Sequence, residues 1–394
     1  MNWRKSIVHP IICLKNRSNY LKYLEELEKT QYFSLDRLRS LQSDRLRTVL
    51  NAALSDVPFY RRLYSSQGIT GDTVSDIAQL RDIPFLTRQD IQENLQDLVS
   101  ERVDGRELIK DKTGGSTGSP INFYYDKDRL DWRKAATTRH DRWAGFDIGT
   151  RHAILWGARS DFSGVRKFKN RIYKYVTEDQ LVLDASAIDD EQLGRFVEEL
   201  RQYKPDIILA YARTLAFFVT FLTENKISVP QPKAIITSAE LLTSDDRSRI
   251  EAVLGAKVYN RYGCREFAVL ASECEHGTMH SNDECYYIET VRADGTLCER
   301  GEEGEIVVTD LLNTAMPMIR YKIGDMGALC KSTCACGRGL RTLSLTSGRV
   351  TDFLQSSGGK KVSGVAIATY VITNIAGIKQ IQFIQKDISR VVVL

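Results

Sequence analysis

Short apolar runs alternate with amphipathic segments through the middle of the chain. The apolar runs, which we interpret as strands, lie at 153–156, 207–210, 234–237 and 258–259. The segments between them have the apolar spacing of helices, at about 190–203, 214–224 and 244–254. Short continuous strands that alternate with helices are typical of a buried, mostly parallel sheet. The pattern therefore predicts an α/β fold with helices on the sheet.

The first third of the chain has a helical pattern. Apolar residues recur at helical spacing over 38–54, and Pro58 ends that helix because the residue before a proline disfavours the α region. Thr87, with Asp90 three residues later, has the pattern of a capping box and predicts a helix over about 87–98. A further helix is expected over 128–144. Its many charged residues indicate a position on the surface.

After residue 280 the pattern changes to β. Apolar stretches at 286–291 and 304–309 flank the turn signal 293–295, which predicts a hairpin. The polar, turn-rich stretch 347–352 is the expected domain boundary. Two domains are predicted: a large N-terminal domain over 1–347, then a hinge and a short or truncated C-terminal lid over 348–394. The large domain has a helical start to about 110, an α/β core over about 111–280 and a β-rich part over about 281–347.

Composition and charge exclude several classes of protein. Of 394 residues, 42% are hydrophobic and 27% are charged, which excludes wholesale disorder. The net charge of +4 is too small to predict nucleic-acid binding. No apolar run approaches the roughly 20 residues of a membrane span. The N-terminal residues lack the small-residue cleavage site of a signal peptide, so a cytoplasmic location is expected.

One Gly/Ser/Thr-rich loop is a candidate phosphate site. The loop runs from Thr113 to Pro120 and precedes an expected strand over 121–125. Glycines let backbone N–H groups approach an anion, and the hydroxyl groups add donors, so the loop suits a polyphosphate. It lacks the Gly-Lys-Ser/Thr ending of a Walker loop. By itself, such a stretch is more often a plain flexible turn.

Two carboxylates follow predicted strands. The stretch Tyr262 to Glu266 follows one strand and the stretch Tyr321 to Asp325 follows another. Enzymes with α/β folds bind ligands at the ends of strands, so Glu266 and Asp325 are candidate ligand-binding groups.

Taken together and in this order, the motifs resemble those of the adenylate-forming ligase superfamily. The resemblance is strongest to the phenylacetate–coenzyme A ligase family and its relatives in capsular polysaccharide biosynthesis, and it extends from about Leu46 to Asp352. The residues that carry it are Ala53 to Tyr64, Asp82 to Thr87, Thr113 to Pro120, Thr237 to Glu240, Tyr262 to Glu266, Tyr321 to Asp325 and Gly348-Arg349.

The resemblance implies roles for these residues. Glu266 would bind magnesium, Asp325 would accept hydrogen bonds from the ribose of ATP, and Arg349 would contact ribose and phosphate. The β- and γ-phosphates would lie against Thr113, Gly114, Gly115, Ser116, Thr117 and Gly118. The adenine would be bordered by Ser238, Ala239, Glu240, Tyr262 and Gly263. Thr117, Glu266 and Arg349 are the residues for which a catalytic role is expected.

The implied reaction has two halves. A carboxylic acid attacks the α-phosphorus of ATP to form an acyl adenylate and pyrophosphate, and a thiol, usually that of coenzyme A, then displaces AMP. No covalent protein nucleophile is needed, and Cys264 is interpreted as a residue beside the pocket rather than a nucleophile. The acid pocket is expected around 156–165, after Tyr211 and at 262–269, where aromatic and basic residues suit an aryl acid or a doubly charged one.

A second constellation indicates a metal. Seven of the eight cysteines lie between Cys264 and Cys336, which is more typical of metal binding than of a disulfide framework. Tetrahedral zinc takes four Cys or His ligands, and two short clusters can supply two each. With the zinc-bearing members of the resembled family as a guide, the predicted structural zinc ligands are Cys274, His280, Cys334 and Cys336, with His276 as the alternative to His280. The other interpretation is that these are reduced surface cysteines.

The C-terminal part departs from the family pattern. Members have a mobile lid with a lysine that contacts the reacting groups, but only 42 residues follow Asp352, and none of the lysines there matches that position. Two alternatives therefore stay open: a catalytically weakened nucleotide-binding or scaffold protein, and an adenylation enzyme that loads a carrier protein. The oligomeric state is also open, a homodimer included.

Overall fold

The computed structural model describes most of the chain. The described residues are 2–70, 76–113, 120–156, 177, 179–184, 190–349, 353–355, 361–363, 371, 375, 381 and 383–394. Within these ranges, no helix combines the length and the apolar character needed to cross a bilayer.

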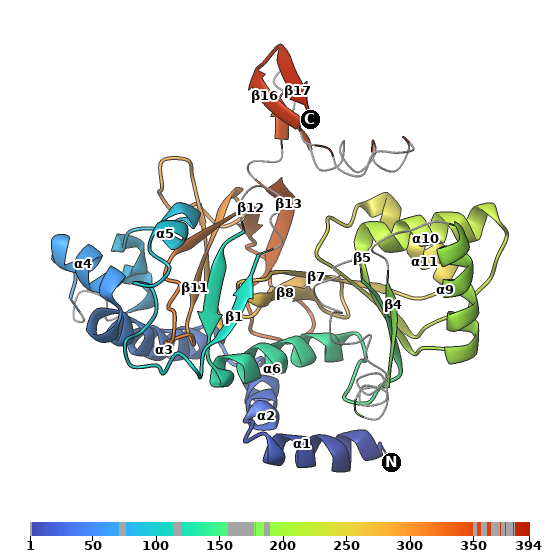
Figure 1. The fold of residues 1–394 in the computed structure, drawn as a ribbon, viewed down its shortest axis with the longest axis horizontal. Coiled ribbons are helices and arrows are strands. Elements are labelled where there is room, and N and C mark those ends of the chain that lie inside the picture. The colour runs from blue at the N-terminus through green and yellow to red at the C-terminus, as the bar shows by residue number, and fades with distance from the viewer. Residues whose placement is uncertain are drawn as a thin grey trace.

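A mixed seven-stranded sheet forms one centre of the molecule (Figure 1). Its order is β4 (Gln180–Asp184), β3 (His152–Trp156), β5 (Ile207–Tyr211), β6 (Ala234–Ser238), β7 (Val258–Cys264), β8 (Ala268–Glu273) and β9 (Met279–Ser281). The first five strands are parallel and the last two are antiparallel. The predicted α/β fold and its strands are confirmed.

Helices cover this sheet as the apolar spacing predicts. They are α9 (Asp190–Tyr203), α10 (Ala212–Glu224) and α11 (Ser244–Leu254). Phe196 and Phe218, from α9 and α10, are almost fully buried, with ring centroids 6.4 Å apart. Thr243 caps the start of α11, and Gly255 ends it with a φ of 65°, a conformation that glycine adopts without a steric penalty. Burial of this apolar layer stabilises the parallel part of the sheet.

A second, antiparallel sheet follows in the chain. Its strands are β10 (Tyr286–Val291), β11 (Gly304–Asp310), β12 (Tyr321–Leu329) and β13 (Leu343–Arg349). The predicted hairpin is confirmed, because Val291 pairs with Glu305 across the turn. Two expectations need correction. Asp325 lies inside β12 rather than after a strand, and residues 347–349 belong to β13 rather than to a turn.

The N-terminal part is helical, as expected. Its elements are η1 (Arg4–Val8), α1 (His9–Lys15), α2 (Tyr20–Thr30), α3 (Leu35–Asp56), α4 (Pro58–Ser66), η2 (Ile77–Asp82) and α5 (Arg88–Glu93). Thr87 and Asp90 form the predicted capping box, but α5 ends at Glu93 instead of near residue 98. A small hairpin of β1 (Ile109–Lys112) and β2 (Asn122–Tyr125) follows.

The C-terminal part contributes two short hairpins. One pairs β14 (Phe353–Gln355) with β15 (Lys361–Ser363), and the other pairs β16 (Phe383–Asp387) with β17 (Arg390–Val393). In Figure 1, β16 and β17 stand at the top of the molecule, while α1 lies along its lower edge. A separate lid over 348–394 stays a prediction.

Helix α6 (Lys127–Trp143) contradicts the expectation that its charge keeps it on the surface. Arg129 and Arg139 are 1% and 0% exposed. Arg129 forms an ion pair with Asp310 at 2.8 Å, and Arg139 forms one with Glu284 at 3.0 Å. The prediction was wrong because a charged side chain can be buried when an opposite charge from a distant part of the chain meets it.

We expect the Arg139–Glu284 pair to be sensitive to the loss of one partner. Arg139→Met leaves the Glu284 carboxylate buried without its counter-charge and should lower the free energy of unfolding by about 3–5 kcal/mol. The double variant Arg139→Met/Glu284→Leu should recover much of that loss. Urea unfolding measures both. Lys29→Met, which breaks the exposed pair with Glu25, is the control and should cost at most about 1 kcal/mol. Equal losses for Arg139→Met and Lys29→Met would contradict the assignment.

Candidate active site

The two sheets meet where several parallel strands end. Tyr262 lies near the carboxyl end of strand β7. Its hydroxyl donates a hydrogen bond to the carboxylate of Asp325, in β12, at 2.8 Å. Tyr262 is buried. This bond joins the end of the seven-stranded sheet to the middle of the antiparallel one. Two residues that the sequence proposed for the same nucleotide are therefore in direct contact.

Glu266 lies just beyond the end of β7 and is half-buried. The hydroxyl of the buried Tyr321 donates to its Oε1 at 3.5 Å. Burial, reinforced by the carboxylates of Glu266 and Asp325, raises the pKa of the Cys264 thiol well above its ordinary value. The thiol is thus protonated near neutral pH, which does not favour Cys264 as a nucleophile.

The backbone beside these side chains is unusually constrained. Ala239 follows β6 with a φ of 69°, a left-handed conformation that costs energy for a residue with a Cβ and is found most often at functional sites. Gly263 is fixed by packing, because a Cβ there would lie 1.9 Å from the carbonyl oxygen of Ala268. The close pairing of β7 with β8 therefore requires glycine at this position whatever its role toward a nucleotide.

The other predicted adenine neighbours lie at the end of β6 and just after it. Ser238 is buried, and its hydroxyl lies 3.5 Å from the guanidinium of Arg261. Glu240 is exposed, and its carboxylate accepts a hydrogen bond from the backbone N–H of Arg213 at 2.8 Å. Arg213 is at the N-terminus of α10, where the helix dipole favours a negative charge.

Arg133 is a site residue that the sequence analysis missed. From α6 its guanidinium donates to the carbonyl oxygens of Arg265 at 2.6 Å and Glu266 at 3.2 Å. It also lies over the ring of Tyr125, 4.5 Å from the ring centroid. Arg133 thus positions the segment that carries Glu266. No local sequence signal identifies it, because its partners lie more than 130 residues away along the chain. The charge of α6 was instead interpreted as a sign of exposure.

Part of the predicted phosphate loop can be located. Thr113 is buried at its base, where its hydroxyl accepts from the N–H of Ile121 at 3.1 Å and its own N–H donates to the Ile121 carbonyl at 3.0 Å. The remaining predicted loop residues lie outside the described residues: Gly114, Gly115, Ser116, Thr117 and Gly118. The backbone of Arg349 pairs with Asp325 between β13 and β12, while its side chain lies outside the description.

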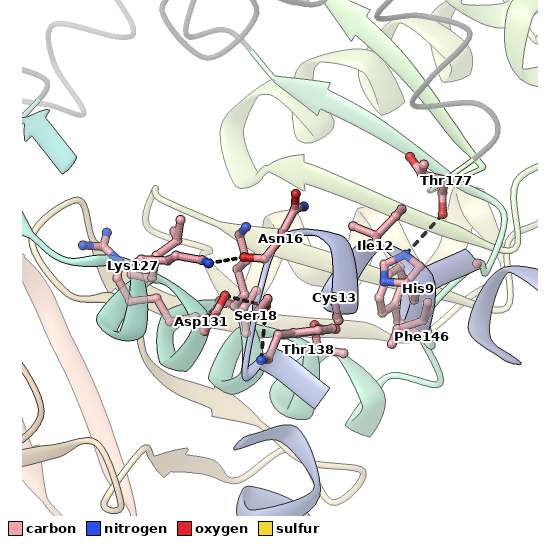
Figure 2. A pocket seen from close by; sticks show the side chains of 18 of the residues that line it. His9, Ile12, Cys13, Asn16, Ser18, Lys127, Asp131, Thr138, Phe146 and Thr177 are labelled. Carbon is pink, nitrogen blue, oxygen red and sulfur yellow. Dashed lines mark hydrogen bonds between the residues drawn. The ribbon is translucent and has the colours of Figure 1, made fainter. Parts of the chain in front are cut away.

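Two aromatic side chains lie at the carboxyl edge of the parallel strands, where the acid pocket was expected. Trp156 ends β3 and Tyr211 ends β5, and their ring centroids are 4.1 Å apart. Most of the predicted stretch 156–165 lies outside the described residues. A cavity of about 940 Å³ lies between α1 and α6 (Figure 2). Its lining includes Arg133 and also Ala268, which belongs to the expected acid-pocket stretch 262–269. None of the predicted nucleotide-binding residues that the structure describes lines that cavity.

Four predicted metal ligands come together beside β9. One ligand atom from each of Cys274, His280, Cys334 and Cys336 lies within 4.8 Å of the others. The Sγ atoms of Cys274 and Cys334 are 3.6 Å apart, and the Sγ of Cys336 is 3.3 Å from Nε2 of His280. Among the residues described, the cluster includes His280 and not His276, which contributes a backbone N–H to the Cys274 sulfur at 3.4 Å.

This ligand set fits a closed tetrahedral zinc site. Three sulfurs and one imidazole are a common set for structural zinc. The Nδ1 of His280 lies 3.1 Å from the carbonyl oxygen of Leu340, so Nδ1–H can donate there and leave the Nε2 lone pair toward the sulfurs. Cys274 and His280 are fully buried, which leaves little access for a substrate. The geometry is that of a structural site rather than a catalytic one.

We expect Arg133 to hold the Glu266 segment in place. Arg133→Gln removes charged hydrogen bonds to two carbonyl groups, each worth roughly 1.5–3 kcal/mol. Amide hydrogens of residues 264–268 should therefore exchange faster, as measured by hydrogen–deuterium exchange with mass spectrometry. Lys134→Gln, at the next and exposed position of α6, is the control. Identical exchange in both variants would rule out this positioning role.

The chain is similar to known proteins along most of its length. It is 25% identical to protein CapK of Staphylococcus aureus over 96% of this chain and 82% of the relative. It is 26% identical to phenylacetate-coenzyme A ligase of Escherichia coli K12 over 84% of this chain and 75% of that ligase. The resemblance indicated by the sequence motifs is confirmed. No protein-family model matches the chain.

Comparison with solved structures gives the same fold. The crystal structure of 2-hydroxyisobutyryl-CoA ligase in the postadenylation state, in complex with an acyl-AMP, superposes with a TM-score of 0.71. The match covers 92% of this chain and 78% of that one at 20% identity. The same ligase with 2-HIB-AMP and CoA in the thioesterification state gives a TM-score of 0.69. The chain therefore has the fold of an adenylate-forming ligase.

Proposed function

We propose that this protein activates a carboxylic acid with ATP as an acyl adenylate and transfers the acyl group to coenzyme A. The observation that carries the proposal is a pair of hydrogen bonds at the junction of the two sheets, from Tyr262 to Asp325 and from Tyr321 to Glu266, with both carboxylates near Cys264. The similarity to phenylacetate-coenzyme A ligases over most of both chains supports it. So does the shared fold with a ligase solved with acyl-AMP and CoA.

In this proposal the nucleotide lies at the carboxyl ends of β6 and β7. Asp325 accepts hydrogen bonds from the ribose hydroxyls, and Tyr262 orients its carboxylate by donating to Oδ2 at 2.8 Å. Arg349, whose backbone pairs with that of Asp325, contacts ribose and phosphate. Adenine lies against Ser238, Ala239, Glu240, Tyr262 and Gly263. The phosphates lie against the loop that begins at Thr113 and includes Thr117.

Glu266 is the proposed ligand for magnesium. A half-buried carboxylate such as that of Glu266 fits a cation that takes one or two carboxylates and otherwise binds phosphate oxygens. When bound, magnesium supplies charge neutralisation on the phosphates. Arg133 keeps the Glu266 segment in position, and Tyr321 donates to the carboxylate. The acid oxygen then attacks the α-phosphorus and pyrophosphate leaves.

The second half-reaction replaces the acyl–phosphate (mixed anhydride) bond of the acyl adenylate by a thioester bond. The thiol of coenzyme A loses its proton, its sulfur attacks the acyl carbon, and AMP leaves with the electrons of the broken C–O bond. The raised pKa of Cys264 argues against a covalent enzyme intermediate. Positioning of the two substrates is then the main contribution of the protein.

The proposal also assigns a structural role to the Cys/His cluster. Cys274, His280, Cys334 and Cys336 are the proposed structural zinc ligands, which would clamp the loop 330–340 onto β8 and β9. Transfer to a carrier protein instead of coenzyme A, or a nucleotide-binding role with weakened catalysis, stays open as an alternative. A role in capsular polysaccharide biosynthesis, a homodimer and a cytoplasmic location stay predictions.

The first test measures nucleotide binding and adenylation. The wild-type chain should bind ATP or AMP in isothermal titration and release pyrophosphate with at least one acid from a panel that includes phenylacetate and 2-hydroxyisobutyrate. Asp325→Ala should weaken nucleotide binding by roughly 1.5–3 kcal/mol, because ribose hydrogen bonds to a charged group are lost. The control is Asp294→Ala, at the exposed turn between β10 and β11. Absence of nucleotide binding at millimolar ATP would sink the proposal. Binding without pyrophosphate release would favour the weakened alternative.

The second test concerns the metal. Protein purified without chelator should contain about one zinc ion per chain, because four protein ligands complete one tetrahedral zinc site. Cys336→Ser should lower both the zinc content and the melting temperature, because metal binding contributes to folding. Cys298→Ser, half-buried and outside the cluster, should change neither. Metal-free wild-type protein with a melting temperature that Cys336→Ser leaves unchanged would contradict the zinc assignment.

A further inference from the structure

The first two helical elements expose their apolar side. None of the residues of η1 and α1 is buried. The exposed fractions are 44% for Trp3, 49% for Ile7, 59% for Ile11 and 82% for Leu14. Spacings of four, four and three residues place these side chains, here called the apolar stripe, on one face of a helix. A helix on the surface of a globular protein normally buries such a face against the core.

The polar side of the same helix is fixed to the body of the protein. Arg4 forms an ion pair with Asp179 at 2.8 Å, and Lys5 forms one with Asp147 at 2.6 Å. The ring of His9 lies 3.2 Å from the carbonyl oxygen of Thr177, as Figure 2 shows. These contacts hold the start and middle of the helix with the apolar stripe turned outward.

The end of the helix is fixed as well. Lys127 of α6 donates to the carbonyl oxygen of Arg17 at 3.0 Å, and Asp131 accepts from the backbone N–H of Asn19 at 2.8 Å. Both ends are thus anchored to the body, and the exposure of the apolar stripe is a property of the fold. An apolar surface held in this way indicates an interaction site.

Charge identifies the kind of partner. The first acidic residue of the chain is Glu25, and the residues before it include five basic ones: Arg4, Lys5, Lys15, Arg17 and Lys22. Lys15 and Arg17 are exposed and directly follow Leu14 of the apolar stripe. An apolar helix face bordered by basic residues and bearing a tryptophan is typical of helices that lie in the interface of a bilayer.

We propose that η1 and α1 form a docking surface for a membrane that contains anionic lipids. The apolar stripe enters the boundary between headgroups and acyl chains, while Lys15 and Arg17 pair with lipid phosphates. A second copy of this chain fits less well, because two basic segments would then face each other. In Figure 1, α1 lies at the edge opposite β16 and β17. The inference is independent of the ligase activity.

Vesicle flotation tests the docking surface. The full chain should float with vesicles of phosphatidylcholine that contain about one third phosphatidylserine, and much less with phosphatidylcholine alone, with binding reduced by salt. Ile11→Asp/Leu14→Asp should lower the bound-to-free ratio about tenfold or more. Lys15→Gln/Arg17→Gln should lower it about fivefold per charge on the anionic vesicles only. The control is Leu241→Asp, since Leu241 is 51% exposed in the loop after β6.

The outcomes separate the alternatives. All variants should keep the wild-type melting temperature, because every substituted side chain is exposed. Flotation of the Ile11→Asp/Leu14→Asp variant at the wild-type level would overturn the proposal. So would an absence of flotation by the wild-type chain together with a dimer, seen in sedimentation velocity, that the same substitutions dissociate. That result would assign the apolar stripe to a contact between copies of the chain.

Discussion

The burial of charge along α6 is the constraint on which the rest of the structure depends. Arg129 and Arg139 project from this helix to Asp310 and Glu284, which belong to the β-rich part of the chain. A guanidinium in the interior is tolerated only when an opposite charge meets it with good geometry. Both pairs therefore fix where α6 lies relative to β10 and β11. With the position of α6 fixed, the positions of its other side chains, including Arg133, are fixed as well.

The candidate active site follows from that position. Arg133, between the two paired arginines on α6, holds the carbonyl groups of the segment that carries Glu266. The hydrogen bond from Tyr262 to Asp325 links β7 of the seven-stranded sheet to β12 of the antiparallel sheet. A nucleotide pocket formed between two sheets requires that the sheets keep their relative position. Here the buried ion pairs of Arg129 and Arg139, which are not among the proposed nucleotide-binding residues, maintain it, and pairing offsets the cost of their burial.

Two features of the structure suggest a binding partner, namely the Cys/His cluster and the exposed N-terminal helix. Cys274, His280, Cys334 and Cys336 form a ligand set that fits zinc, next to a small apolar cluster that includes Leu38, Trp143 and Leu340. Metal binding at such a site can contribute to folding. At the N-terminus, the helix of η1 and α1 uses its polar side for attachment and leaves its apolar stripe outside. Each arrangement is explained most simply by a partner, a metal ion in one case and a lipid surface in the other.

The sequence by itself determined the alternation of strands and helices over about 153–259, the capping box at Thr87 and the hairpin of 286–291 with 304–309. Apolar spacing, capping and turns are properties of neighbouring residues. The motifs also indicated Tyr262, Glu266 and Asp325 and the four residues of the Cys/His cluster, but not Arg133. Only the tertiary structure decided that α6 is buried, that Asp325 lies within a strand, and that His280 rather than His276 completes the cluster. Whether a charge is buried depends on its partner, and the partners of Arg139 and Arg129 lie 145 and 181 residues away along the chain. No local pattern of hydrophobic and polar residues encodes a contact at that separation.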